Sequence, residues 1–481
     1  MARRPTLHEV EVVDDESDPG PSPPAARPAV PRRGWVLGGA VLAVLLAVGV
    51  TAQVLQTRRD RAQVAAVAAH AGGVALLDGP PAALWQLPTR DLYGVAEVRT
   101  PEGLLVGVRD SDSGPVEVAA VDAVTGAQRW HVELVDGATR PQARPGFSTY
   151  ADSGRCAAHG TQEHLVVCLA HDGTYVVGQG ATLPLPPSTT RLVVLDTRAG
   201  TLVADLGTAV ADDERPTSFA AVGDLVVVTV ASQRGTTVRA TTLDGAVVWE
   251  RPVTSAPDAG GDPYVLRLGE LVALLTAREM TLLDADGRTV RTRPLGDEYA
   301  VADAETIRLV PSDAAAGDAR TTVVRPAGDL DVPGDVLHLT VDDGSVPGLV
   351  LTTAGGELTA LVHGEELWSV PDPQGWNALV VGGRVHLDAG LELLTLDART
   401  GAELWTTTVA TTLPVTDGRH LLAVARPVEA DDPPELVALD PADGSVSWRS
   451  PLPPGSIELT SHLGLLLVSS GEGAQLLTVL G

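Results

Sequence analysis

The stretch AVDAVTGAQRW, residues 120–130, decides the fold, because two later stretches repeat its pattern. Asp122 is followed four residues later by Gly126 and four residues after that by Trp130. The same spacing returns in TLDARTGAELW (395–405) and ALDPADGSVSW (438–448), which contain Asp397, Gly401 and Trp405, and Asp440, Gly444 and Trp448. A pattern that returns in this way indicates a structural repeat.

Each residue of the pattern has a structural reason. The Asp-x-x-x-Gly segment is typical of a hairpin turn, in which Asp bonds to nearby backbone and Gly supplies a positive φ. We expect the Trp on the outermost strand of a small sheet, where its large flat ring covers the seam to the next sheet.

Shorter or degenerate versions of the pattern fill the rest of the chain. Trp85, Trp249 and Trp368 follow Gly-containing turns, so that six of the eight Trp occupy one position, at intervals of 37 to 45 residues where they are adjacent. Ala204 and Arg291 take that position after Asp and Gly at similar spacing. Such a period is typical of propeller blades. The closing residues Trp85, Trp130, Ala204, Trp249, Arg291, Trp368, Trp405 and Trp448 predict eight blades.

Seven or nine blades stay open because two intervals are long. The interval from Arg291 to Trp368 has room for a hidden blade around TTVVRPAGDLDV (321–332), and the one from Trp130 to Ala204 indicates an insertion. Within each repeat, four apolar or alternating runs of five to eight residues predict a four-stranded antiparallel meander. The last repeat has three such runs, so we expect the strand around Trp85 to complete it and close the ring.

The motif Ala-x-Asp-x-x-Thr-Gly-x-x-x-Trp at residues 120–130 resembles the tryptophan-docking motif of pyrroloquinoline-quinone (PQQ) propellers. This resemblance implies an all-β, PQQ-like propeller over residues 74–481; a WD40 propeller is the alternative fold, but the Trp-Asp dipeptide is absent. The family includes quinoprotein dehydrogenases. Resemblance to these enzymes would imply a disulfide between adjacent cysteines and a bound calcium. The two cysteines here are not adjacent. The chain therefore looks more like the family's non-catalytic envelope scaffolds.

Residues 34–57 contain no charged side chain over 24 positions, which is long enough for a transmembrane helix. The acidic and Pro-rich residues 1–33 predict a disordered tail. The Ala-rich residues 58–73 predict a helical stalk. Flanking Arg residues are balanced, but a short tail before a single span is typical of an uncleaved signal anchor. We expect a cytoplasmic N-terminus and a propeller outside the cytoplasm.

Composition excludes some classes of function. The 62 acidic residues outnumber the 34 basic residues and give a net charge of -28, which disfavours nucleic-acid binding. The 50 Gly and 36 Pro disfavour an all-helical fold.

The densest group of reactive residue types is RCAAHGTQEHLVVCLAHDG, residues 155–173. A hairpin centred on Gln162 places Cys156 opposite Cys168, close enough for a disulfide, which a location outside the cytoplasm would permit. Reduced thiols stay possible, and so does a zinc site made of both cysteines with His159 and His171. Acidic turns such as Asp110–Gly114, Asp284–Gly287 and Asp342–Gly344 lack the spacing of a calcium loop.

We find no catalytic motif and expect no catalytic, cofactor or metal residues. The sequence thus predicts a membrane-anchored propeller that binds a protein or a cell-envelope ligand without catalysis. Two alternatives stay open: a quinoprotein-like dehydrogenase with an unrecognised cofactor site, and a sensor that couples the outside propeller to the cytoplasmic tail.

Overall fold

The computed structural model describes the propeller region and a few residues before it. The described residues are 72–110, 114–136, 148–178, 181–209, 214–254, 262–302, 306–312, 320–375, 377–390, 392–409, 415–425, 433–471 and 476–481, with Thr51, Gln53, Val64, Val67, Ala68 and His70. The expected tail, nearly all of the expected span and most of the expected stalk lie outside them. In this described part, no helix combines the length and the hydropathy that a membrane crossing needs.

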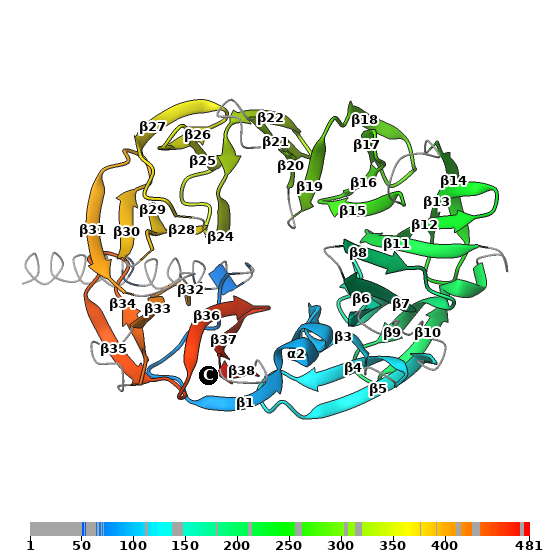
Figure 1. Cartoon of the computed structure of the whole chain (residues 1–481), viewed down its shortest axis with the longest axis horizontal. Helices are drawn as coiled ribbons and strands as arrows, with labels where there is room; N and C mark the ends of the chain where they lie inside the picture. The colour runs from blue at the N-terminus through cyan, green and yellow to red at the C-terminus, as the bar shows by residue number, and fades with distance from the viewer. Residues whose placement is uncertain are drawn as a thin grey trace, which may run out of the picture. The chain divides into compact units, whose positions relative to one another are not determined.

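The described chain from Val98 onward forms sheets that follow one another almost in chain order and are antiparallel except for one parallel pair (Figure 1). The first blade contains β2 (Val98–Arg99), β3 (Leu104–Asp110), β4 (Val116–Asp122) and β5 (Gln128–Val135). The second contains β6 (Ser148–Ala158), β7 (Leu165–Gly178), β8 (Ala181–Leu185), β9 (Thr190–Asp196) and β10 (Thr201–Asp205), followed by the short 3-10 helix η2 (Leu206–Ala209). The third contains β11 (Arg215–Val222), β12 (Leu225–Ser232), β13 (Gly235–Thr241) and β14 (Val247–Val253).

The fourth, fifth and sixth blades occupy the middle of the chain. The fourth contains β15 (Tyr264–Leu268), β16 (Leu271–Leu275), β17 (Glu279–Leu283) and β18 (Thr289–Pro294). The fifth contains β19 (Glu298–Ala302), β20 (Ile307–Pro311), β21 (Arg320–Arg325) and β22 (Gly328–Pro333). The sixth contains β23 (Asp335–Val336), β25 (Leu349–Ala354), β26 (Glu357–Val362) and β27 (Glu365–Pro371).

The last three blades complete the set. The seventh contains β24 (His338–Asp342), which pairs in parallel with β28 (Asn377–Val381), then β29 (Arg384–Asp388), β30 (Glu392–Asp397) and β31 (Glu403–Thr408). The eighth contains β32 (Val415–Thr416), β33 (Leu421–Ala425), β34 (Glu435–Leu439) and β35 (Val446–Pro451). The ninth contains β36 (Ser456–His462), β37 (Leu465–Ser470), β38 (Leu476–Leu480) and, from the other end of the chain, β1 (Ala83–Pro88).

The all-β propeller is confirmed, but the count of eight blades is wrong, because the described residues form nine sheets. The additional one is the fifth blade, β19–β22, which contains the stretch TTVVRPAGDLDV. It escapes the repeat pattern because Leu330 stands where other blades have Trp. The long interval before Ala204 is an insertion, in which β7 runs past β9 and pairs with β8 instead.

Burial follows strand position within a blade. Inner strands such as β16 and β33 are buried along almost their whole length, which explains their continuous apolar runs. Outermost strands alternate between exposed and half-buried residues, as β1, β18 and β31 do. The core therefore lies between neighbouring blades and not inside any single sheet.

Prolines protect the free edges of the outermost strands. Among the described blades, six outermost strands carry Pro at their last or next-to-last position, namely Pro88, Pro252, Pro294, Pro333, Pro371 and Pro451. Proline lacks the backbone N–H that an added strand would need. These positions oppose edge-to-edge aggregation.

The ring closes through non-local pairing of β1 with β38, in which Trp85 lies opposite Val479. The helix α2 (Thr89–Val95) then links β1 to β2 and buries Leu92 and Val95. Asp417, which is fully buried, accepts a hydrogen bond from the Leu77 amide at 3.2 Å and so ties the segment before β1 to the eighth blade. Val67 is also fully buried, in a cluster with Val341, Leu379 and Leu421.

Five indoles among the described residues pack on a turn glycine of the next blade. A Cβ added to Gly126 would lie 2.7 Å from the Trp85 ring, and the corresponding distance from Gly401 to the Trp368 ring is 2.8 Å. The same approach, between 2.5 and 2.8 Å, holds for Gly200 with Trp130, Gly287 with Trp249 and Gly444 with Trp405. Only glycine fits at these five turns, because any side chain would overlap the ring.

We predict that Gly126→Ala lowers the free energy of unfolding by about 1 kcal/mol for the left-handed backbone and by a further ~1–3 kcal/mol for the overlap with Trp85. Gly103→Ala is the matched control, since Gly103 has a similar φ of 79° against 68° at Gly126 but has nothing within 4 Å of its added Cβ. The control should show the backbone cost alone. Equal losses in urea unfolding would contradict indole docking at this turn.

Candidate functional site

The docking turns combine a buried or half-buried ring with a directed hydrogen bond. The Trp85 Nε1–H donates to the carbonyl oxygen of Ala123 at 3.1 Å, and the Trp368 Nε1–H donates to that of Ala398 at 3.0 Å. Trp130, Trp249 and Trp405 donate in the same way to Thr197, Ala285 and Pro441 at 2.7, 2.9 and 3.2 Å. Every acceptor is the residue directly after the turn Asp.

The turn aspartates hold those carbonyls in place. Asp122 Oδ1 accepts hydrogen bonds from the amides of Val124 and Thr125 and from the Thr125 hydroxyl. These bonds from Thr125 and Val124 lower the pKa of Asp122. Asp397 makes the equivalent bonds to Arg399 and Thr400, and Asp440 accepts from the Ala442 amide. The recurring Asp therefore stabilises the turn that receives the indole.

Blades without Trp use other side chains in the same position. Arg291 donates to the carbonyl oxygen of Arg325 in the next blade at 2.8 Å and pairs with Asp329 at 2.9 Å. Leu330 fills the position in the fifth blade, since a Cβ on Gly364 would lie 2.8 Å from its Cδ1. Ala204 is too small to cross the seam, and both Ala204 and Leu243 of the third blade pack against the same buried cluster.

The seam between the eighth and ninth blades is different. Because β1 arrives from the other end of the chain, no hairpin joins it to β38, and Trp448 meets no Asp-Gly turn there. Trp448 Nε1 is buried without a hydrogen-bond partner among the described residues, although His420 lies against the ring with centroids 6.1 Å apart. At this seam an indole occupies the usual position, but no carbonyl oxygen of the described chain accepts its N–H.

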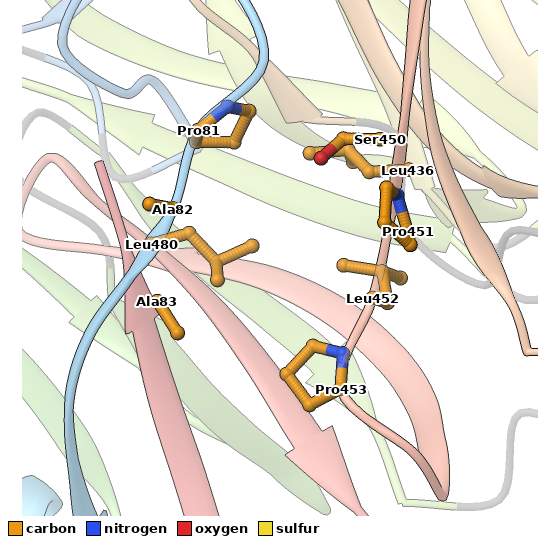
Figure 2. A pocket seen from close by; sticks show the side chains of 9 residues that line it. All are labelled: Pro81, Ala82, Ala83, Leu436, Ser450, Pro451, Leu452, Pro453 and Leu480. Carbon is orange, nitrogen blue, oxygen red and sulfur yellow. The ribbon is translucent and has the colours of Figure 1, made fainter.

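A cavity of about 310 Å³ opens at the same seam. Figure 2 shows Pro81, Ala82, Ala83 and Leu480 on one side and residues of the eighth blade on the other. The lining residues of the eighth blade are Leu436, Ser450, Pro451, Leu452 and Pro453. The Ser450 hydroxyl is the one polar side-chain group among them, so the wall suits an apolar group.

Cys156 and Cys168 are joined by a disulfide across β6 and β7, where they are paired in register with Cα atoms 4.1 Å apart. The bonded sulfurs leave no thiolate for a zinc ion. His159 is buried, which lowers its pKa, and His171 lies with Nε2 at 3.9 Å from Asp152. Among the described residues, no three His, Cys, Asp or Glu side chains gather as metal ligands would.

The acidic turns act as local caps. Asp284 Oδ1 accepts from the amides of Asp286 and Arg288 at 3.0 and 2.8 Å. Asp342 and Asp343 cap the amides of Gly344 and Ser345, both at 2.9 Å. Their oxygens are used in shaping the turns.

Two titratable groups with shifted pKa values, one buried and one half-buried, had no signal in the sequence. His386 on β29 is fully buried, shares a hydrogen bond of 2.8 Å between Nδ1 and Thr395 Oγ1, and lies beside the Trp405 ring. Burial, with a smaller contribution from Arg384, lowers the pKa of His386 to about 3. Glu97 is half-buried between the first two blades, and loss of hydration there raises its pKa to about 7. Neither residue belongs to a repeat motif, so only tertiary contacts reveal them.

Comparisons with known proteins agree with this geometry. Residues 388–475 match a PQQ-type family model described as outer membrane protein assembly factor BamB. Those residues are similar to PQQ-like repeats. The resemblance to PQQ-like propellers is thereby confirmed over that stretch, which spans the two outer strands of the seventh blade, the eighth blade and two strands of the ninth. No curated protein matches the chain.

Several solved structures also match the chain, at low sequence identity. BamB from Moraxella catarrhalis is 16% identical, with a TM-score of 0.37, over 83% of this chain and 99% of that chain. A quinohemoprotein alcohol dehydrogenase from Comamonas testosteroni is 13% identical, with a TM-score of 0.41, over 84% of this chain and 76% of that chain. Apo AztD from Citrobacter koseri is 8% identical, with a TM-score of 0.34, over 73% of this chain and 95% of that chain.

We predict that Trp405→Phe destabilises the protein more than Trp448→Phe. The first change removes a hydrogen bond and leaves the Pro441 carbonyl unpaired, which costs about 1 kcal/mol beyond the loss of ring area. The second removes an N–H that has no partner. Urea unfolding of the two variants measures the difference, and an equal or larger loss for Trp448→Phe would contradict the account of the closing seam.

We also predict an acid-sensitive contribution from His386. Its imidazole is neutral in the fold but takes up a proton near pH 6.5 when unfolded, so its stabilisation is present above pH 6.5 and is lost as the pH falls toward 3. Between pH 6.5 and 5 the wild type should lose about 2 kcal/mol more than His386→Gln. Unfolding free energies measured across this range test the prediction, and parallel pH profiles would refute it.

Proposed function

We propose that the propeller is a non-catalytic binding module for a protein or a cell-envelope ligand, held at a membrane by residues 34–57 and facing away from the cytoplasm. The match of residues 388–475 to a family model named for an assembly factor supports a binding role. The recurrent residues are used in docking one blade on the next, which makes the ring a rigid support for surface contacts.

The observation that carries the proposal is a row of exposed aliphatic side chains on the outermost strands, here called the outer row. Each member directly precedes the residue that enters the seam and therefore points the other way. Its members are Leu84, Val203, Val248, Val290, Leu367 and Leu404, which are 42 to 53% exposed. Exposed apolar groups that recur on neighbouring elements are typical of protein-binding surfaces.

The outer row is most continuous over the last blades. Leu367 and Leu404 lie on β27 and β31, the outermost strands of consecutive blades, and Val446 on β35, the outermost strand of the next blade, is 46% exposed. Because prolines limit strand addition at many of these edges, we expect a partner to bind through side-chain packing and not through backbone pairing.

Purification of the full chain from its native membrane, followed by mass spectrometry of the proteins that accompany it, tests this function. We expect Leu367→Ser with Leu404→Ser to lower recovery of the partner several-fold. Val124→Ser, at an exposed turn residue outside the outer row, is the matched control and should leave recovery unchanged. Full recovery with the double variant, or oxidation of an alcohol by the purified protein given PQQ and calcium, would contradict the proposal.

A further inference from the structure

The carboxyl group of Glu97 joins the first blade to the second through backbone hydrogen bonds. Its Oε2 accepts from the Val108 amide on β3 at 3.1 Å and from the Cys156 amide on β6 at 2.7 Å. One side chain therefore connects strands of two blades at the inner end of their seam. The second of these amides belongs to the disulfide that fastens β6 to β7.

The surroundings of this carboxyl are tight and made largely of backbone. A Cβ added to Gly107 would lie 2.2 Å from the Gly94 oxygen and 3.1 Å from Glu97 Cγ. Such packing leaves Glu97 half-buried, so its carboxyl is only partly hydrated as long as the two blades stay together. A partly dehydrated carboxylate is costly unless its charge is compensated.

The charged groups nearby have other partners. Arg155 on β6 faces the seam, but its guanidinium donates to the Phe219 carbonyl of the third blade at 2.6 Å and lies 5.2 Å above the Phe219 ring. On the other elements packed here, Arg99 of β2 donates to Leu463, Arg109 of β3 pairs with Glu117, Asp110 of β3 accepts from Ser153, and His462 of β36 contacts the Ala96 carbonyl.

We propose that Glu97 is a pH-sensitive switch of the seam between the first and second blades. The protonated carboxyl accepts both amide bonds without a buried charge, so the seam stays closed. The ionised carboxylate favours an opened seam, in which water reaches it. The pH of the surrounding medium thereby sets how often β6 separates from β3.

The direction of the pH effect follows from the difference in the proton affinity of Glu97 between the closed and the opened seam. Burial raises the pKa of Glu97 to about 7 against a reference value of 4.5, and the two amide bonds and Arg155 offset only part of this effect. The closed seam is fully stabilised below pH 4.5 and loses stability as the pH rises through about 7. The opening equilibrium should therefore increase by roughly 100-fold between pH 5 and pH 8.5.

Hydrogen–deuterium exchange of the full chain, with mass spectrometry of peptides covering residues 104–110 and 153–160, measures this opening. After correction for the intrinsic pH dependence of exchange, protection in the wild type should fall by roughly two orders of magnitude from pH 5 to pH 8.5. Glu97→Gln should remove this pH dependence, because the amide side chain accepts a hydrogen bond but does not ionise.

Glu102→Gln is the matched control. Glu102 is an exposed carboxylate that pairs with Arg198 across the same seam, so this variant should keep the wild-type pH dependence. Unchanged protection of the wild type across the range, or an identical pH dependence in Glu97→Gln, would overturn the proposal. Should Glu97→Gln fail to fold, the wild-type profile decides by itself: opening must increase only above pH 4.5 and level off above about 7.

Discussion

The structure depends on the contact between an indole and the hairpin turn of the following blade. The contact is demanding from both sides, because the ring requires glycine beneath it and its N–H requires a carbonyl held at the right place. Asp at the start of the turn fixes that carbonyl, as Asp122 does for Trp85. Burial of each ring contributes on the order of 2 kcal/mol and the hydrogen bond about 1 kcal/mol, at every seam where it occurs. Because the same contact recurs from blade to blade, it sets the distance between neighbouring sheets.

The sequence predicted the fold wherever this contact uses tryptophan. Trp85, Trp130 and Trp405 mark outermost strands, because a large flat ring at a fixed spacing after an Asp-Gly turn stands out in the sequence. Closure through the strand around Trp85 also followed from the pattern, since three apolar runs at the end of the chain lacked a fourth. The fifth blade was hidden for the same physical reason. Leu330 fills its seam by ordinary aliphatic packing, and a leucine after a Gly turn does not stand out from any other core residue.

The remaining features depend on contacts between residues far apart in the chain. Arg291 shows its role only once the Arg325 carbonyl and Asp329 lie beside it. Asp417 and Leu77 are 340 residues apart, and Glu97 is 59 residues from Cys156, whose amide donates a hydrogen bond to its carboxyl group. Carboxylates that shape turns and carboxylates that join blades look identical in a sequence. The candidate binding surface could not be predicted from the sequence either. Strand periodicity predicts that side chains alternate between two faces, but not which face a neighbouring blade covers.

Seams of unequal chemistry give the ring unequal strength. Indole docking holds five of them, an arginine network and a leucine hold two others, and the closing seam leaves Trp448 Nε1 without a partner. Two titratable groups then make stability depend on pH in opposite directions, since His386 weakens the fold in acid and Glu97 weakens one seam as the pH rises. An experimentally determined structure of the full chain, by electron cryomicroscopy or crystallography, tests the central claim most directly. It should show nine sheets, β1 paired with β38, and each of five indoles seated on a glycine of the next blade. Eight sheets, or indoles turned toward solvent, would contradict the account.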